Sequence, residues 1–306
     1  MAKVFITGVA GFIGSNLAVR LLEEGHEVVG IDDLSHGLQE QVPEGVSFVK
    51  QDIRSKDIYP LFKDVNYVFH LAALSSIPDC QNDPVSACDD NTTGTVNVFE
   101  ASAKAGVKKI IFAETSAVYE GIKQFPTPED AVEPHSVYAV GKMAARLFAK
   151  PYKEFRNLDS VGVRYFNVYG PRQDYRRSIP PLMSAFILAL LRGETPVIYG
   201  DGEKRRDFVY VDDVNDAHLL LMKDDRANNQ IYNIGSGTNN SINEIYKMIK
   251  GLLGADVEPV HKNNLEAEAQ ITLADCSRLK SLGWHPKTNL EEGIKIQIDY
   301  IKKHVI

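Results

Sequence analysis

The stretch VFITGVAGFIGSNL, residues 4–17, decides the fold. A strand-like apolar run leads into a glycine-rich turn, and a segment with helical periodicity follows. Such a turn lets the backbone approach a pyrophosphate, which then lies at the N-terminus of the helix. We therefore predict a dinucleotide-binding turn made of Gly8, Gly11, Phe12, Ile13 and Gly14.

Two acidic residues follow the next apolar runs. Asp32 ends the run EVVGID, where a carboxylate can accept hydrogen bonds from ribose hydroxyls and would repel a 2′-phosphate. This position predicts NAD rather than NADP as the cofactor. Asp52 follows the third run, close to where an adenine would lie, and it either contacts that base together with Ile53 or belongs to a solvated turn.

The order of the predicted elements indicates an α/β protein. In the first half, short apolar runs alternate with helical segments such as 12–24 and 85–105, which predicts a parallel sheet with helices on both faces. After Pro171 the pattern loosens. We predict a Rossmann-type doubly wound sheet in residues 1–170 and a smaller, partly interleaved substrate domain in residues 171–306. In this second part we expect helices at 179–192, 214–222, 242–253 and 290–303 and short strands at 195–200 and 230–235.

Composition narrows the function further. The 306 residues are 44% hydrophobic and 25% charged, with a net charge of −7, so nothing suggests a nucleic-acid surface. The three cysteines have no metal-ligand spacing, and we expect no metal. The apolar run AFILALL is too short to span a membrane, and the N-terminus enters a strand pattern without a signal-peptide segment. We therefore expect a cytoplasmic protein.

The stretch SVYAVGK, residues 136–142, places Tyr138 and Lys142 at positions i and i+4. On a helix these side chains share one face, and a nearby ammonium lowers the pKa of a phenol. The pair could thus form a base that works near neutral pH. Alternatively, Tyr138 simply packs and Lys142 is solvated.

Several motifs together resemble one family. The chain contains TGVAGFIGSNL, IDDLSHG, FHLAA, SAVY, YAVGK, RYFNVYGPRQD, GDGEKRRDFVYVDDV and YNIGSG in that order. In this order and spacing they resemble the extended short-chain dehydrogenases/reductases, and among these the nucleotide-sugar 4-epimerases. The resemblance implies a domain that holds NAD and a smaller domain that holds a UDP-sugar. It also implies a homodimer, formed here through residues 85–105 and 138–155.

The resemblance assigns the catalytic roles. Tyr138 would be the base that removes the proton of the sugar 4-hydroxyl, and Lys142 would bind the nicotinamide ribose and lower the pKa of Tyr138. Thr115 would share the proton with Tyr138, and Ser116 is the second choice for this relay. Leu71, Ala72 and Ala73 would line the cofactor cleft, whereas we expect a structural role for the preceding His70.

The resemblance also identifies substrate contacts. Arg206 and Asn167 match residues that bind the diphosphate, and Thr272 occupies the position that faces the sugar 2-substituent. We expect Arg205 to be solvated. A small residue at position 272 would leave room for an N-acetyl group. Alternatively, Thr272 is a β-branched strand residue whose only role is packing.

Four positions depart from the family pattern. Leu265 and Gln270 stand where arginines are frequent, so the phosphate contacts would be weaker or supplied by Arg176 and Arg177. Glu114 and Glu120 stand where small residues are usual. We interpret Glu120 as solvated, and the sequence offers no account of Glu114.

The reaction follows from which acids are absent around the SAVY motif. Related dehydratases carry an Asp-Glu pair after the threonine, and related decarboxylases carry a glutamate just before the Val-Tyr pair; here these positions are Ser116 and Ala117. This predicts a 4-epimerase acting on UDP-GlcNAc/UDP-GalNAc, on UDP-glucose/UDP-galactose, or on both. The alternatives are a UDP-glucuronate 4-epimerase, another sugar-nucleotide enzyme of this fold, a net NAD-dependent dehydrogenase and an NAD-sensing protein.

Overall fold

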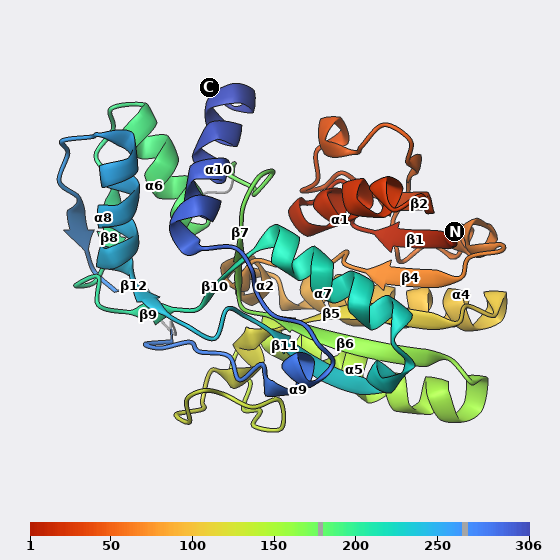
Figure 1. Ribbon diagram of the computed structural model, residues 1–306. Coiled ribbons are helices and arrows are strands. Elements are labelled where there is room, and N and C mark those ends of the chain that lie inside the picture. The colour runs from red at the N-terminus through yellow and green to blue at the C-terminus, as the bar shows by residue number, and fades with distance from the viewer. Residues whose placement is uncertain (177–179, 265–268) are drawn as a thin grey trace.

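A seven-stranded parallel sheet forms the centre of the protein. The computed structural model describes residues 1–176, 180–264 and 269–306 (Figure 1). The strands lie in the order β3-β2-β1-β4-β5-β6-β11, and every neighbouring pair is parallel. Their bounds are β1 (Lys3–Thr7), β2 (Glu27–Asp32), β3 (Ser47–Lys50), β4 (Tyr67–His70), β5 (Lys109–Thr115), β6 (Asp159–Tyr165) and β11 (Gln230–Ile234). This confirms the predicted Rossmann-type doubly wound sheet.

Helices cover both faces of the sheet. Two helices, α1 (Phe12–Glu23) and α7 (Val211–Lys223), contact each other on one face, and α4 (Thr95–Ala105) and α5 (Val137–Arg156) contact each other on the opposite face. Because side chains alternate along a strand, Ile111 packs with the first pair while Phe112 packs with the second. Each face therefore has its own hydrophobic core.

Local packing interrupts one of the predicted helices. The helix expected at 85–105 consists of α3 (Pro84–Cys88), a π-helical turn η3 (Asp89–Gly94) and α4. Ile53 packs against Gly94, where a β-carbon would overlap its side chain. Such π-turns are frequent near functional sites.

The remaining elements form the smaller, C-terminal part and the connections of the large sheet. Three helices, α6 (Leu182–Leu191), α8 (Ile242–Leu253) and α10 (Leu290–His304), share a core at one end of the molecule (Figure 1). Short two-stranded pairs join β7 (Asn167–Tyr169) to β10 (Phe208–Tyr210), β8 (Val197–Tyr199) to β13 (Val260–Lys262), and β9 (Arg205–Arg206) to β12 (Asn240–Ser241). The other elements are η1 (Gln39–Gln41), η2 (Lys56–Phe62), α2 (Ile77–Asn82), η4 (Ser116–Tyr119), η5 (Asp225–Ala227) and α9 (Ser277–Ser281).

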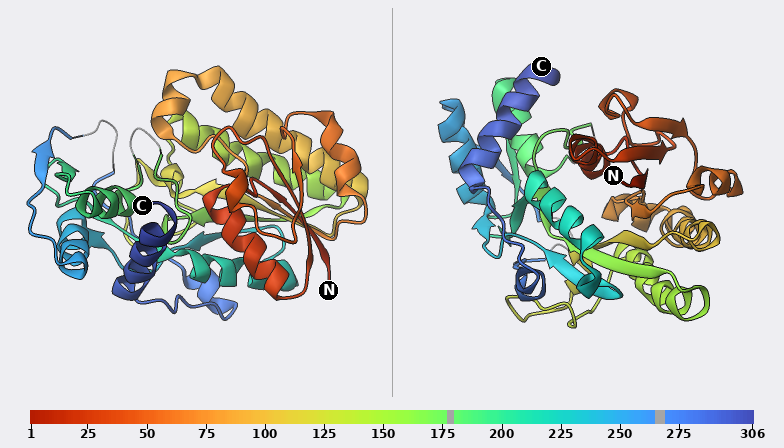
Figure 2. Two further views of the ribbon diagram at one scale, coloured as in Figure 1. Left: turned by 90° about the horizontal axis from the view of Figure 1, so that it is seen from above. Right: turned by 45° about the vertical axis from the view of Figure 1, so that its right-hand side comes forward.

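The helix predictions for this second part hold with shifted ends. The bounds of α8 equal the predicted range 242–253, α10 extends one residue further, and α7 begins at Val211. Ile179 lies outside the described residues, and α6 begins at Leu182. The strand predicted at 230–235 is β11, which pairs with β6 in the large sheet (Figure 2). Among the helices of the described ranges, none is long and apolar enough to cross a membrane.

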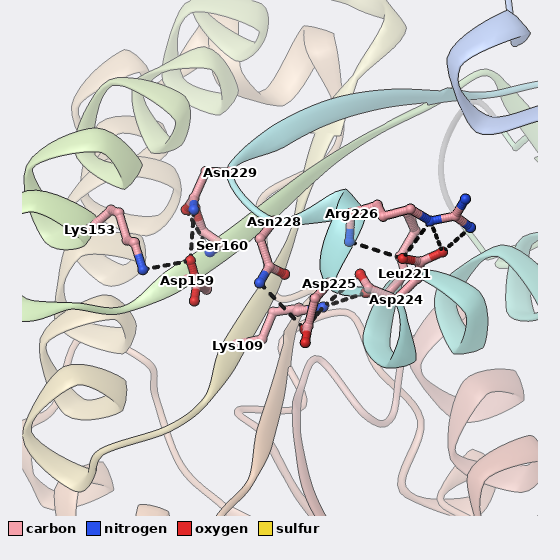
Figure 3. A network of polar contacts seen from close by, with 10 residues as sticks. All are labelled: Lys109, Lys153, Asp159, Ser160, Leu221, Asp224, Asp225, Arg226, Asn228 and Asn229. Carbon is pink, nitrogen blue, oxygen red and sulfur yellow. Dashed lines mark hydrogen bonds and ion pairs between the residues drawn. The ribbon is translucent and has the colours of Figure 1, made fainter. Parts of the chain in front are cut away.

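A polar network holds the amino ends of β5 and β6 (Figure 3). The buried ammonium of Lys109 donates to the carbonyl oxygens of Leu221 (3.1 Å) and Asp224 (3.0 Å), at the C-terminus of α7. A cation there is favoured by the helix dipole. Nearby, Asp159 accepts from Asn229 (2.7 Å) and pairs with Lys153 of α5 (2.9 Å). The network anchors α5 and α7 at the amino ends of β5 and β6, away from the carboxyl ends of the strands.

Candidate active site

A cavity opens at the carboxyl ends of β1 and β4, where the strand order reverses. This switch point is the usual ligand site of doubly wound sheets. The cavity has a volume of about 280 Å³. All of the predicted cofactor-binding residues line it, namely Gly8, Gly11, Phe12, Ile13, Gly14, Asp32, Asp52, Ile53, Leu71, Ala72, Ala73, Tyr138 and Lys142.

The glycine turn needs its glycines for two reasons. Gly8 has a φ of +75°, and a β-carbon there would lie 2.8 Å from the backbone nitrogen of Ala72. A β-carbon on Gly14 would overlap the carbonyl oxygen of Gly8, so only glycine lets α1 start this close to β1. The chain thus leaves backbone exposed to the cavity at the helix N-terminus, which fits a pyrophosphate.

Asp32 is held in place by the backbone around it. Its Oδ2 accepts from the Ala10 N–H (3.1 Å) and its Oδ1 accepts from the Leu34 N–H (2.9 Å). Burial raises the pKa of this carboxyl, and the two backbone hydrogen bonds oppose the rise. Each carboxylate oxygen retains acceptor capacity, so the residue fits the ribose hydroxyls of NAD.

Asp52 lies in the same cavity but already has a partner. Its carboxylate accepts three hydrogen bonds from the Arg54 side chain, the shortest 2.6 Å, and Arg54 also pairs with Asp90 of the π-turn (3.0 Å). The Arg54 hydrogen bonds lower the pKa of Asp52. Asp52 is therefore not an isolated solvated residue. It lies near the predicted adenine position, and its carboxylate is paired with Arg54.

Tyr138 and Lys142 lie on α5 as the i, i+4 spacing predicts. The Ser136 side chain caps the helix by accepting from the Ala139 N–H (3.2 Å). Glu120 accepts from the His135 N–H (2.7 Å), the Ser136 N–H (2.8 Å) and the Ser136 hydroxyl (2.8 Å). The interpretation of Glu120 as solvated is therefore wrong, because it ties the turn after β5 to the helix start that carries Tyr138.

The lysine of this pair is buried. Lys142 is 3% exposed, and burial lowers the pKa of its ammonium to about 8. A lysine with this pKa keeps most of its charge at neutral pH and loses it in mildly alkaline solution. The alternative of a solvated Lys142 is excluded.

Thr115 ends β5 and is buried. Its hydroxyl oxygen accepts from the Ala117 N–H (3.1 Å), so its own proton remains available for donation. Ser116 is half-buried at the start of η4.

His70 is a buried residue at the end of β4. Its Nδ1 lies 2.8 Å from the Thr7 hydroxyl and its Nε2 lies 2.8 Å from the Thr95 hydroxyl. Burial lowers the pKa of the imidazole to about 3. The Thr7 hydroxyl also accepts from the backbone N–H groups of Leu71 and Ala72, so the group shapes the cavity wall, in line with the expected structural role.

The predicted substrate contacts form a second group. Asn167 donates through Nδ2 to the Thr272 hydroxyl (3.3 Å), which also accepts from the Asp207 N–H (3.1 Å). Arg206 in β9 donates to the carbonyl oxygens of Arg205 (3.0 Å) and Gln270 (3.4 Å). The fold thus places three segments that are distant in sequence next to one another, and these carry Asn167, Arg206 and Thr272.

The basic residues near these groups differ in their environments. Arg205, which we expected to be solvated, has a side chain that is 36% exposed; it also donates to Asn239 (2.9 Å) and pairs with Glu244 (3.1 Å) at the surface. Arg176 lines the cofactor cavity and donates to the His36 carbonyl oxygen (2.8 Å). Arg177 and Leu265 lie outside the described residues.

Some cavity residues are absent from the sequence-based set. They come from the turn after β2, from β5 and from the segment after Gly170, and include Ser35, His36, Gly37, Gln41, Glu114, Arg172 and Tyr175. Arg172 donates to the carbonyl oxygens of Ser15 (3.3 Å) and Gln41 (3.0 Å). The motifs IDDLSHG and YGPRQD contain several of these residues, but nothing local indicates that the two segments meet.

Comparisons with known proteins agree with this geometry. The family described as NAD dependent epimerase/dehydratase matches residues 4–235. The UDP-glucose 4-epimerase of Thermotoga maritima, solved with UDP-glucose, has a TM-score of 0.96 at 37% identity and covers 99% of this chain and 100% of its own. The UDP-N-acetylglucosamine 4-epimerase of Methanobrevibacter ruminantium, solved with UDP-N-acetylmuramic acid, has a TM-score of 0.95 at 34% identity, covering 99% of both chains.

A third relative acts on another sugar. The UDP-glucuronate 4-epimerase of Thermodesulfobacterium geofontis is 34% identical over 100% of this chain and 98% of its own. Together with the cavity, these similarities show that the chain is an NAD-dependent enzyme of the extended short-chain dehydrogenase/reductase type that resembles UDP-sugar 4-epimerases, and that it belongs to the NAD dependent epimerase/dehydratase family.

Proposed function

We propose that the protein is a 4-epimerase that interconverts UDP-GlcNAc and UDP-GalNAc, alongside UDP-glucose and UDP-galactose. The observation that carries the chemistry is the pairing of Tyr138 and Lys142 on α5 within the cavity of the glycine turn and Asp32. The observation that favours an N-acetyl sugar is the small, half-buried Thr272 beside Asn167.

The mechanism uses one base in both directions. NAD, which the glycine turn and Asp32 would hold, would supply hydride transfer from C4 of the sugar and its return to the opposite face. Tyr138, as the phenolate, removes the proton of the 4-hydroxyl, and Thr115 relays or shares that proton, with Ser116 as the second choice. After the 4-keto sugar has rotated in the site to present its opposite face, Tyr138 returns the proton to the new 4-hydroxyl. The ammonium of Lys142 would stabilise the phenolate of Tyr138 by its charge.

The diphosphate would be held by Arg206 and Asn167. A guanidinium matches phosphate geometry, and an amide N–H donates to phosphate oxygens. Arg206 is 8% exposed, so a phosphate bound there would be largely removed from water and its interaction with the arginine would be strong. Arg176 would serve the cofactor side instead, since it lines that cavity.

A uronic acid is the second candidate substrate, because a UDP-glucuronate 4-epimerase is among the relatives. Its carboxylate would need a cation at the sugar. Arg176 donates to the His36 carbonyl oxygen in the turn after β2, near the predicted ribose site. This placement favours an uncharged hexose. A net dehydrogenase would instead release NADH and would need no diphosphate contacts.

We propose that residues 1–170 mainly hold NAD and residues 171–306 mainly hold the UDP-sugar, with β11 returning to the large sheet. We also propose a homodimer through α3, α4 and α5. Large apolar side chains are exposed there, at Val85 (73%), Leu147 (66%) and Phe155 (80%). Sedimentation of the purified protein should give the mass of two chains, and the mass of one chain at micromolar concentration would contradict the dimer.

The function is tested by incubating the holoenzyme with UDP-GlcNAc, UDP-glucose and UDP-glucuronate and separating the C4 epimers. We expect UDP-GalNAc to form from UDP-GlcNAc without a stoichiometric rise in NADH absorbance. If UDP-glucuronate is the only sugar converted, the protein is a UDP-glucuronate 4-epimerase instead. Accumulation of NADH without an epimer would indicate a dehydrogenase.

A further inference from the structure

Glu114 is a buried acid that the mechanism above does not use. It precedes Thr115 in β5, and its side chain is fully buried. The strand register places it opposite Arg164 of β6, whose Nε donates to Glu114 Oε2 at 2.6 Å. Arg164 is fully buried and also donates to the Tyr119 hydroxyl (2.8 Å) and the Glu129 carbonyl oxygen (2.6 Å).

The ion pair leaves half of the carboxylate without a hydrogen bond. Within residues 1–176, 180–264 and 269–306, no polar atom is in hydrogen-bonding position to the buried Glu114 Oε1. A buried oxygen without a hydrogen bond destabilises the fold, and more so when it carries charge. An acid kept at this cost next to Thr115 invites a reason other than folding.

The surroundings of Glu114 supply that reason. Glu114 lines the same cavity as Tyr138 and Lys142, and it lies on the α5 side of the sheet, as does its strand neighbour Phe112. Burial lowers the pKa of Lys142, and the Glu114 carboxylate is the strongest influence that opposes this. Uncompensated burial of an ammonium would favour its neutral form, which could no longer stabilise a phenolate.

Other charged and titratable groups lie around Glu114 and Lys142. Burial raises the pKa of Glu114 above its usual value, and Arg164 on β6, Arg146 on α5 and Lys142 itself oppose this rise. Tyr119 on η4 is hydrogen-bonded to Arg164, and Cys80 on α2 acts on Lys142 in the same direction as Glu114, with a smaller effect. Among them, Glu114 is the carboxylate that acts on Lys142.

We propose that Glu114 is a positioning residue of the epimerase reaction, whose buried carboxylate keeps Lys142 in its ammonium form so that Tyr138 can act as the base. The proposal rests on the proposed function of Tyr138 and Lys142. It accounts for an acidic residue at a position where the resemblance leads one to expect a small one.

The pH profile of kcat for the holoenzyme tests this proposal. The alkaline limb reports loss of the Lys142 proton, and Glu114→Gln removes the opposing charge while preserving size. We expect the limb to move to lower pH by about one unit, a typical effect of a close opposite charge in a buried site. Glu114→Ser, which introduces a small uncharged residue, should move it in the same direction and replaces Glu114→Gln if that variant does not fold.

A second readout does not depend on turnover. Cyanate modifies only the neutral form of an amine, and mass spectrometry resolves the Lys142 peptide. We expect Lys142 to react faster in Glu114→Gln than in the unaltered protein at neutral pH. Lys150 on the same helix, whose side chain is 80% exposed, provides the internal reference and should react equally in both.

Glu129→Gln is the matched control. Glu129 is also buried, and it accepts from the Asn233 N–H (3.0 Å) and pairs with Arg278 (3.5 Å). This change should lower stability without moving the alkaline limb or the reactivity of Lys142. If Glu114→Gln leaves both the alkaline limb and the cyanate reactivity of Lys142 unchanged, the proposal is overturned. The proposed function would still stand in that case, provided that Tyr138→Phe is inactive. An equal shift in Glu129→Gln would also overturn the proposal for Glu114.

Discussion

Tyr138→Phe is expected to lower turnover by at least about 10²-fold, the usual contribution of a positioned acid–base group. The reason is that phenylalanine cannot remove or return the proton of the sugar 4-hydroxyl. Its ring retains the packing of the tyrosine at the half-buried start of α5, so folding and NAD binding should remain intact. The measurement is kcat with the most active UDP-sugar, together with thermal unfolding and NAD content.

Two further variants sharpen this test. Tyr152→Phe is a control on the same helix, because its hydroxyl contacts Glu100 (3.2 Å) and the Val96 carbonyl oxygen (3.5 Å) of α4 rather than the cavity. It should retain turnover. Thr115→Val, which keeps the shape and removes the hydroxyl, should slow the reaction less than Tyr138→Phe. Near-normal turnover in Tyr138→Phe would refute the mechanism.

Thr272→Tyr is expected to lower the ratio of kcat/KM for UDP-GlcNAc over that for UDP-glucose by at least about 10-fold. Thr272 is half-buried beside Asn167, and a phenol side chain there would fill the space that we assign to the acetamido group. A steric clash acts against the larger sugar alone, and one misfitting methylene group already changes selectivity by about 10-fold or more.

Thr272→Ser is the matched control for this substitution. It preserves a hydroxyl that can accept from Asn167 and from the Asp207 N–H, and it adds no bulk. Its ratio of kcat/KM should therefore stay close to that of the unaltered enzyme. An unchanged ratio in Thr272→Tyr would show that residue 272 does not face the 2-substituent. An unaltered enzyme that leaves UDP-GlcNAc unconverted would remove the N-acetyl assignment.

The sequence by itself determined the features that depend on local spacing. The glycine turn before α1, Asp32 at the end of β2 and the i, i+4 pair of Tyr138 and Lys142 all follow from periodicity and backbone conformation within a few residues. The alternation of apolar runs and helical segments likewise predicted the parallel sheet. Local patterns are sufficient here because an α/β sheet places consecutive strand ends together along one edge.

The tertiary structure alone decided which distant residues meet. The sequence offers no sign that Glu114 pairs with Arg164, that Glu120 holds the start of α5, or that Asn167 reaches Thr272. The π-turn between α3 and α4 was also missed, and the pairing of the predicted strand β11 with β6 came from the structure. These contacts arise from packing between residues that are 15 to more than 100 positions apart, and a buried charge pairs with whichever partner the fold brings to it.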